Sequence, residues 1–162
     1  MLIKQVAINA SPLIVLFKSY QSELLPQLFT EIIVPHTVWE EITKTEKDDE
    51  AARNLPGATW AKRGTGISLI PEVAAADLGK GESEVLSFCL INPEFVAIVD
   101  DRAAKKCAKA LGIVTLGTGG ILLLAKHRRL IPTLTPRLQA LREAGLWLSD
   151  SVYHLLKQQA GE

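Results

Sequence analysis

An uninterrupted apolar run that ends in two acidic residues is the feature that most restricts how this chain of 162 residues can fold. The run Val96–Val99 is too short for a buried helix and rich in β-branched side chains, which is typical of a strand covered on both faces. Asp100 and Asp101 follow it directly. Ligands of open α/β sheets bind at the carboxyl edge of the strands, so these two carboxylates are candidate ligands for a cation.

The segment after this run predicts a second strand parallel to the first. A helix is expected from Arg102 to Leu111, with small apolar residues on one face, lysines on the other, and Gly112 as its stop. Residues 113–116, Ile-Val-Thr-Leu, are again mostly apolar and rich in β-branched side chains. Residues 96–116 therefore predict a βαβ unit with parallel strands and a right-handed crossover.

Two similar strand-to-helix steps are predicted in the first part of the chain. A strand from Val6 leads to a helix for which Ser11 is the expected N-cap and Pro12 the first residue, so Asn9 falls where strand turns into helix. A second strand over 32–35 leads to a helix over 36–42. A short helix over 24–29 is expected between the two steps.

The middle of the chain contains the least regular patterns. The charged run 44–50 is expected to be solvated surface, followed by a short helix over 51–55. Residues 59–70 could form two short strands or an excursion from the main sheet, and the sequence does not choose between them. The next helix begins near Leu78 and stops at Asn92-Pro93.

The last part of the chain predicts three helices. The first covers 121–129, after a Gly117-Thr-Gly-Gly segment that we interpret as a turn, and the second contains Leu138 and Leu141. Ser149 is the expected N-cap of the third, whose apolar face consists of Val152, Leu155 and Leu156.

Length and composition favour a single domain over residues 1–162. Lys plus Arg and Asp plus Glu both number 18, so overall charge does not direct the chain to nucleic acid or membrane. Cys89 and Cys107 have no metal-ligand spacing and are expected to be reduced thiols in apolar surroundings. The first residues lack the order of a signal peptide, and no apolar run approaches the ~18 residues of a membrane span, so we expect a cytoplasmic protein with no membrane partner.

Helical periodicity selects three glutamates that could join the aspartate pair. At about 100° per residue, Glu41 lies about 60° to one side of the apolar Val38, whereas Glu40 lies almost opposite it. Glu82 lies at the N-terminal end of the apolar stripe of its helix, and Glu84 occupies a neighbouring row. Glu41, Glu82 and Glu84 are therefore the candidates for inward-facing acids.

Each of these residues also has a purely structural interpretation. An aspartate after a strand commonly caps the next helix, and glutamates in a first turn interact favourably with the helix dipole. Glu41 could be a boundary residue, and Asn9 could cap the first helix or hold a turn.

Several short motifs follow one another in a fixed order. They are Asn9-Ala-Ser-Pro-Leu, Val38-Trp-Glu-Glu-Ile, Gly81-Glu-Ser-Glu, Val99-Asp-Asp-Arg and Gly117-Thr. In this order and spacing the set resembles the PIN-domain nucleases, and most closely the PIN-like prokaryotic proteins related to VapC toxins. The similarity extends over nearly the whole chain and includes Gly145-Leu-Trp-Leu-Ser-Asp.

The resemblance implies a fold, a cofactor and a reaction. The fold is a three-layer α-β-α sandwich with a central, mostly parallel sheet. The cofactor is Mg²⁺ or Mn²⁺, held by carboxylates at the carboxyl edge, and the reaction is endonucleolytic hydrolysis of single-stranded RNA. The metal ligands carried over by position are Asn9, Glu41, Glu82 or Glu84, and Asp101 with Asp100 beside it. Among them Glu41, Glu82 and Asp101 are the expected catalytic residues.

Asn9 departs from the family pattern, because the first position is normally an acid. Asparagine offers one neutral carbonyl oxygen where aspartate offers a charged carboxylate. Mg²⁺ can be held by one or two carboxylates together with water and substrate phosphate, so we expect weaker metal binding and not its abolition.

Two basic clusters could bind RNA phosphates, or could simply be solvated helix surfaces. Their candidate residues are Arg102 and Lys105 after the aspartate pair, and Lys126 and Arg128 further on.

Three functions remain in competition at this point. The leading hypothesis is a toxin-type endoribonuclease, which would have a cognate antitoxin and form a homodimer, with Trp39 or the first helices as its apolar patch. The alternative is a PIN-like module that binds RNA or a partner protein without cleaving. A phosphoacceptor receiver domain is a weaker third hypothesis, because it would need its acid pair just after the first strand, where this chain has Asn9-Ala10.

Overall fold

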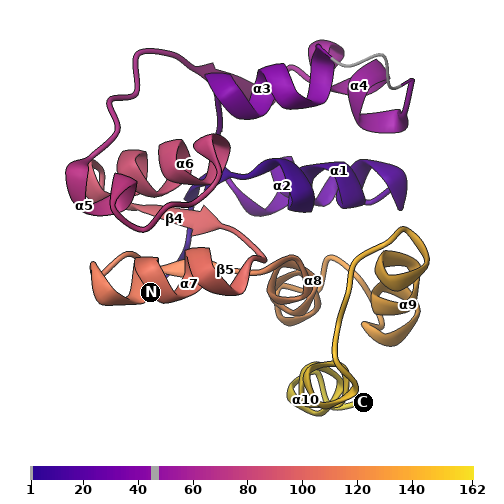
Figure 1. The fold of residues 1–162 in the computed structure, drawn as a ribbon. Coiled ribbons are helices and arrows are strands. Elements are labelled where there is room, and N and C mark those ends of the chain that lie inside the picture. Colours follow the sequence, from indigo (N-terminus) through magenta and orange to yellow (C-terminus); the bar gives the residue numbers. More distant parts are fainter. Residues whose placement is uncertain (1, 45–47) are drawn as a thin grey trace.

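A computed structural model of the protein describes residues 2–44 and 48–162. Its centre is a five-stranded sheet in which every strand pair is parallel. The strands are β1 (Gln5–Ile8), β2 (Glu31–Pro35), β3 (Ala61–Gly64), β4 (Phe95–Ile98) and β5 (Thr115–Leu116), in the spatial order β3-β2-β1-β4-β5. Helices flank this sheet (Figure 1), so the predicted α/β sandwich with a parallel sheet is confirmed.

The helices alternate with the strands along most of the chain. They are α1 (Ala10–Lys18), α2 (Leu24–Leu28), α3 (His36–Thr43), α4 (Glu50–Asn54), the 3-10 turn η1 (Leu55–Gly57), α5 (Pro71–Ala74), α6 (Lys80–Ile91), α7 (Arg102–Ala110), α8 (Thr118–His127), α9 (Thr135–Glu143) and α10 (Asp150–Gln159). In Figure 1 the last three helices gather at one end of the molecule, and α10 packs against α8.

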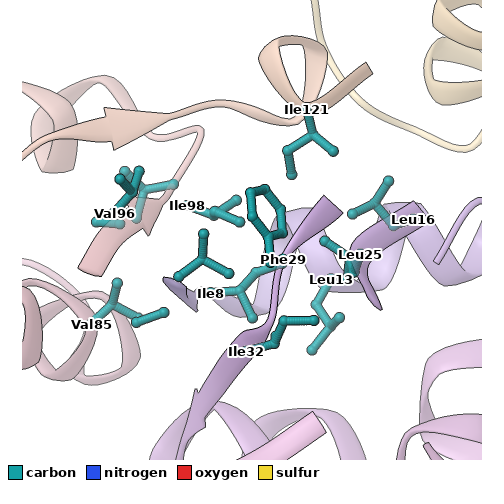
Figure 2. Close-up of a cluster of buried hydrophobic side chains, with 14 of the residues drawn as sticks. Ile8, Leu13, Leu16, Leu25, Phe29, Ile32, Val85, Val96, Ile98 and Ile121 are labelled. Carbon is teal, nitrogen blue, oxygen red and sulfur yellow. The ribbon is translucent and has the colours of Figure 1, made fainter. Parts of the chain in front are cut away.

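The core is built from the faces of the sheet and the apolar sides of its helices. Residues of β4 are buried along its whole length, as the apolar run Val96–Val99 predicts. Figure 2 shows Ile8 and Ile98 from adjacent strands packed with Leu13 of α1 and Val85 of α6. This packing fixes the starts of α1 and α6 relative to the ends of β1 and β4.

The strand order places the ends of β1 and β4 beside each other. Ile8 pairs with Ile98, and the backbone N–H of Asn9 donates to the carbonyl oxygen of Ile98 at 3.0 Å. Along the chain, β2 and then β3 are added on one side of β1, and β4 and then β5 on the other side. Ligands bind at such a switch point, so Asn9 and the aspartates after β4 share the expected ligand-binding edge.

Two predicted helix starts are wrong. The first helix begins at Ala10, with Asn9 and not Ser11 at the N-cap position, and no side-chain hydrogen bond caps it. Pro12 is tolerated because N–H groups in a first helical turn have no intrahelical acceptor. The helix expected from Ile121 begins at Thr118, so the segment interpreted as a turn is helical.

The glycines of that segment serve packing and not a turn. A Cβ atom on Gly119 would lie 2.7 Å from Cδ1 of Leu156, so any larger residue there would displace the Leu156 side chain of α10. The predicted N-cap of α10 is confirmed, because Ser149 accepts from the N–H of Val152. Its predicted apolar face is wrong in part: Leu156 is buried, but Val152 and Leu155 are 42% and 50% exposed.

The remaining segments settle the open points of the middle region. Residues 61–64 form the single edge strand β3, residues 65–70 are irregular, and the short helix α5 follows, which was not predicted. Part of the charged run 44–50 lies outside the described residues, and at its end Asp49 caps α4 through the N–H of Ala52. Cys89 is a buried free thiol and Cys107 a half-buried one. None of the helices within 2–44 and 48–162 has the length and apolar content needed to cross a membrane.

Candidate functional site

A cavity of about 570 Å³ opens where the ends of β1 and β4 meet. Asn9 reaches it from the end of β1, Glu82 from the first turn of α6, and Asp100 and Asp101 from the end of β4. The rest of the wall comes from α1, the start of α7 and the segment between α9 and α10. These lining residues are Ser11, Ile14, Val15, Arg102, Ala144, Gly145, Leu146 and Trp147.

Glu82 and Asp101 form the closest contact between acids at this site. The Glu82 carboxyl lies within hydrogen-bonding reach of Asp101, and its Oε2 atom is buried without a hydrogen-bond partner among the described residues. Burial raises the pKa of Glu82, and the negative charges of Asp101 and Glu41 raise it further. Two carboxylates in this arrangement need a shared proton or a cation between them.

Glu41 and Asn9 both lie against Gly81 near the start of α6, and of the two only Asn9 lines the cavity. A Cβ atom on Gly81 would lie 2.8 Å from Oε1 of Glu41 and 3.4 Å from Oδ1 of Asn9. Glycine at this position of α6 therefore lets both polar groups reach the helix start. Glu41 is exposed as a whole, so the predicted inward-facing position is only partly realised. Partial desolvation of its carboxyl group and the neighbouring charge of Glu84 raise the pKa of Glu41.

Asp100 and Glu84 are each bound to a threonine at the start of another helix. Asp100 accepts the backbone N–H of Thr118 at 2.8 Å and the Thr118 hydroxyl at 2.5 Å. Glu84 accepts the backbone N–H of Thr37 at 3.1 Å and also the Thr37 hydroxyl. Both carboxylates thus satisfy free N–H groups at the starts of α8 and α3. Their role as metal ligands remains a prediction.

Asp101 combines a capping contact with its place at the site. One oxygen, Oδ2, accepts the N–H of Ala104 at 3.0 Å and so caps α7. The carboxylate also lines the cavity and faces Glu82. The structural and functional interpretations of this residue are therefore compatible.

The residues at this edge fit a divalent cation that keeps several water ligands. Within the described part of the chain, no group of three acidic, histidine or cysteine side chains is arranged to hold one ion. The Glu82–Asp101 pair nevertheless offers two carboxylates and a buried oxygen with no partner, and Asn9 adds a carbonyl oxygen. Mg²⁺ is commonly bound by one or two carboxylates plus water and substrate phosphate.

A comparison with protein-family models decides which fold family this architecture represents. The family model described as a PIN domain matches residues 5–162, which is nearly the whole chain. The chain belongs to the PIN domain family. A search of curated proteins and a search of solved structures gave no match. The fold of this PIN domain is nuclease-like, and PIN domains generally use divalent metals.

The structure separates the four basic residues that were candidates for RNA binding. Arg102 lines the cavity of the PIN domain, and a Cβ atom on Gly117 would lie 3.2 Å from Nζ of Lys105 and 3.1 Å from Oδ1 of Asp100. Arg102 and Lys105 therefore flank the acidic edge.

Lys126 and Arg128 instead contact backbone carbonyls within the fold. Nζ of Lys126 donates to the carbonyl oxygen of Pro132 at 2.9 Å, and the Arg128 guanidinium donates to those of Leu28 and Ile3 at 2.7 and 2.9 Å. These contacts join α8 to neighbouring segments, whereas Arg102 and Lys105 remain beside the acidic edge.

Sequence reasoning missed the part of the cavity wall that comes from the end of the chain. Gly145-Leu-Trp-Leu-Ser-Asp was noted as part of the family resemblance, but Trp147 was not named as a site residue. Trp147 lies between the glycine that ends one helix and the serine that caps the next, so the sequence places it in a loop. Because binding residues are often found on loops, this position could have indicated a site residue. Thr118, the partner of Asp100, belongs to the Gly117-Thr motif, whereas Thr37, the partner of Glu84, carried no comparable signal.

Proposed function

We propose that this PIN domain is a metal-dependent endoribonuclease of the VapC toxin type that cleaves single-stranded RNA with carboxylate-bound Mg²⁺ or Mn²⁺. The observation that carries the proposal is the Glu82–Asp101 pair, in which a partly buried carboxyl group faces a carboxylate and leaves one oxygen without a partner. The repulsion between these two acids destabilises the fold, and replacing either acid would relieve it. Their place at the ligand-binding edge therefore favours a functional role over a structural one.

The residues that would hold the metal are Glu82 and Asp101, with the carbonyl oxygen of Asn9 nearby. When bound, the cation supplies an activated water molecule and stabilises the charge that develops on the scissile phosphate. Three protein groups from three separate elements reach this position, which suits an ion that retains water and accepts a phosphate oxygen from the substrate.

Glu41 has the properties of the group that handles the proton. Its Oε1 atom lies against Gly81 at the edge of the site, and its pKa is raised by burial and by Glu84. A raised pKa brings a carboxylate nearer to the operating pH, where it accepts a proton from water more effectively. Glu41 would then act as the general base.

Arg102 and Lys105 would orient the RNA backbone. Both side chains are exposed beside the acidic edge, Arg102 in the cavity wall and Lys105 near Asp100. Each can contact a phosphate oxygen without reading the base. Their positive charges would also offset the repulsion between the RNA and the carboxylates.

The experiment is cleavage of an unstructured RNA in Mg²⁺ or Mn²⁺ by the parent protein and by matched variants. We expect Glu82→Gln and Asp101→Asn to lower the rate by at least about a hundredfold, in line with loss of an acid–base or ligand group. Glu94→Gln removes one negative charge from an exposed residue just before β4 and is the matched control, which should cleave like the parent. Equal cleavage by all four proteins would exclude this site.

The second candidate is a PIN domain that binds RNA or a partner protein without cleaving. One observation favours this candidate. The side chain at the end of β1, next to Gly81, is the neutral amide of Asn9, which gives a cation one negative charge fewer than an aspartate would. If this reading is right, the parent protein is inactive and Asn9→Asp creates metal-dependent cleavage. Efficient cleavage by the parent protein would exclude it.

The toxin type further implies a cognate antitoxin, a homodimer and a cytoplasmic location. Trp39, which is half-buried with the Arg63 guanidinium 5.6 Å from its ring centroid, remains our candidate for the dimer surface. Light scattering at working concentration tests dimerisation, and a monomer would contradict it. Loss of RNA cleavage on adding the product of a neighbouring reading frame would support the antitoxin.

A further inference from the structure

A tryptophan stands almost fully exposed at the rim of the candidate active site. Trp147 is 83% exposed and lines the same cavity as Glu82 and Asp101. The other two tryptophans of the chain, Trp39 and Trp60, are half-buried. Exposure alone does not assign a role to an aromatic residue, but the place of Trp147 in the wall of the acidic cavity makes its ring available to a ligand bound there.

The backbone on both sides of Trp147 is held in place. The N–H of Leu146 donates to the carbonyl oxygen of Leu141 at 2.9 Å, and Arg142 donates to that of Leu148 at 3.0 Å. Arg142 is itself fixed over the ring of Tyr153, with its guanidinium 4.0 Å from the ring centroid. The indole ring is therefore presented by an ordered segment, which lowers the entropy lost when a ligand binds.

The cavity is lined by both apolar and polar side chains. The apolar ones include Trp147 and Leu146 from the segment after α9, and Ile14 and Val15 of α1. The acidic edge and Asn9 lie in the same cavity, together with the positive charge of Arg102. Such a site suits a planar group with an apolar face, polar edges and an attached phosphate, which describes a nucleotide.

We propose that Trp147 is the platform on which one base of the single-stranded RNA stacks beside the scissile phosphate. Arg102 contacts a neighbouring backbone phosphate, so the two residues fix the register of the RNA over Glu82 and Asp101. Trp147 acts as a positioning residue and tolerates any base, because every base has a face that can stack. The inference rests on the proposed function for the identity of the ligand as RNA.

Binding can be separated from cleavage by measuring it without divalent metal. Fluorescence anisotropy of a labelled oligouridylate is recorded in chelator for the parent protein, Trp147→Ala and Trp147→Phe. We expect Trp147→Ala to raise the Kd about 5- to 100-fold, the range for loss of one base stack, and Trp147→Phe to restore most of the affinity. Because the side chain is exposed, the thermal unfolding of both variants should match that of the parent.

Tyr20 provides the matched control, because it is an aromatic residue that is 82% exposed outside this cavity. Tyr20→Asn suits the left-handed backbone at this residue, where φ is 58°, and should leave the Kd unchanged. A second readout is intrinsic fluorescence. The RNA should quench the parent protein, and the quenched component should be missing in Trp147→Phe.

The possible outcomes separate this inference from the proposed nuclease activity. If Trp147→Ala weakens RNA binding but the parent does not cleave, the stacking role stands and the nuclease proposal fails. If the parent cleaves while Trp147→Ala binds and cleaves normally, the nuclease proposal stands and the stacking role is overturned. Unchanged RNA binding with loss of self-association in light scattering would make Trp147 a protein-interface residue and would also overturn it.

Discussion

The Glu82 carboxyl group lies against the Asp101 carboxylate, with Oε2 of Glu82 buried and lacking a hydrogen-bond partner among the described residues. These two residues come from the start of α6 and the end of β4. Their charges repel, and burial of Glu82 strengthens the effect. The pair is therefore a local source of instability that a proton or a cation would remove.

The first prediction concerns pH and the metal-free protein. The folded-state pKa of Glu82 is raised above its ordinary value, so the protonated form favours folding and deprotonation at higher pH disfavours it. We expect Glu82→Gln to stabilise the metal-free protein at pH 7 by less than about 1 kcal/mol, since the group is only partly buried. The gain should disappear below the ordinary glutamate pKa, and urea unfolding at several pH values measures it.

Metal binding should reverse the order of stabilities. Mn²⁺ or Mg²⁺ should raise the melting temperature of the parent protein, because a ligand that binds the folded state stabilises it. It should have little effect on Glu82→Gln. A parent protein whose melting temperature does not respond to either ion would contradict the metal site.

The second prediction concerns Gly81. A Cβ atom there would lie 2.8 Å from Oε1 of Glu41 and 3.1 Å from Cγ2 of Val38. We expect Gly81→Ala to lower the free energy of unfolding by about 1–3 kcal/mol, as overpacking does. It should also displace Glu41 and so lower the rate of RNA cleavage by the protein that remains folded. Gly57→Ala is the control, because nothing lies within 4 Å of the added atom. Chemical denaturation and RNA cleavage are measured on the same preparations.

The third prediction separates the two aspartates. Both oxygens of Asp100 accept hydrogen bonds from Thr118, whereas Asp101 faces Glu82 with part of its carboxylate. We expect Asp100→Asn to lower stability by about 1 kcal/mol, typical of a weakened helix cap, and to retain cleavage. Asp101→Asn should abolish cleavage. The opposite pattern would make Asp100 the metal ligand and reduce Asp101 to a cap of α7.

The fourth prediction concerns Glu162, far along the chain. Its carboxylate accepts hydrogen bonds from the backbone N–H of Leu134 and from Thr135, and it pairs with Lys126. These hydrogen bonds, with a smaller contribution from Lys126, lower the pKa of Glu162 to about 2. Because the folded-state pKa is depressed, the stabilisation is complete above the ordinary pKa of 4.5 and is lost as the pH falls toward 2.

Glu162→Gln should therefore be less stable than the parent protein at pH 7, and the difference should shrink as the pH falls below 4.5. Thermal unfolding of both proteins across this pH range measures it. A difference that stays constant down to pH 2 would mean that the charge of Glu162 contributes nothing.

Local patterns in the chain were sufficient to predict most elements of the fold. The apolar run before Asp100 is the buried strand β4, and the glycine after α7 adopts the left-handed conformation expected of a helix stop, with φ 73° at Gly112. These features depend on neighbours in sequence, so periodicity and cap residues report them. The positions of Asn9, Glu82 and Asp101 at strand ends and helix starts were predictable in the same way.

Contacts between distant segments could not be predicted from those patterns. The glycines at the start of α8 resemble a turn in sequence, and only the structure shows that Gly119 is helical and packs against Leu156. Asp100 and Glu84 are metal candidates in sequence, and only the structure shows that both oxygens of each carboxylate accept hydrogen bonds from Thr118 and Thr37. Trp147 lies at the site because the chain returns to the carboxyl edge after α9.

The linear order of residues thus determined that parallel strands would end in polar groups, since alternation, apolar runs and capping residues act over a few positions. Only the tertiary structure decided that β1 lies next to β4, which brings Asn9 beside the aspartates and turns Glu82 against Asp101. The physical reason is that strand order and side-chain contacts follow from burying one shared core, and that burial depends on all segments at once.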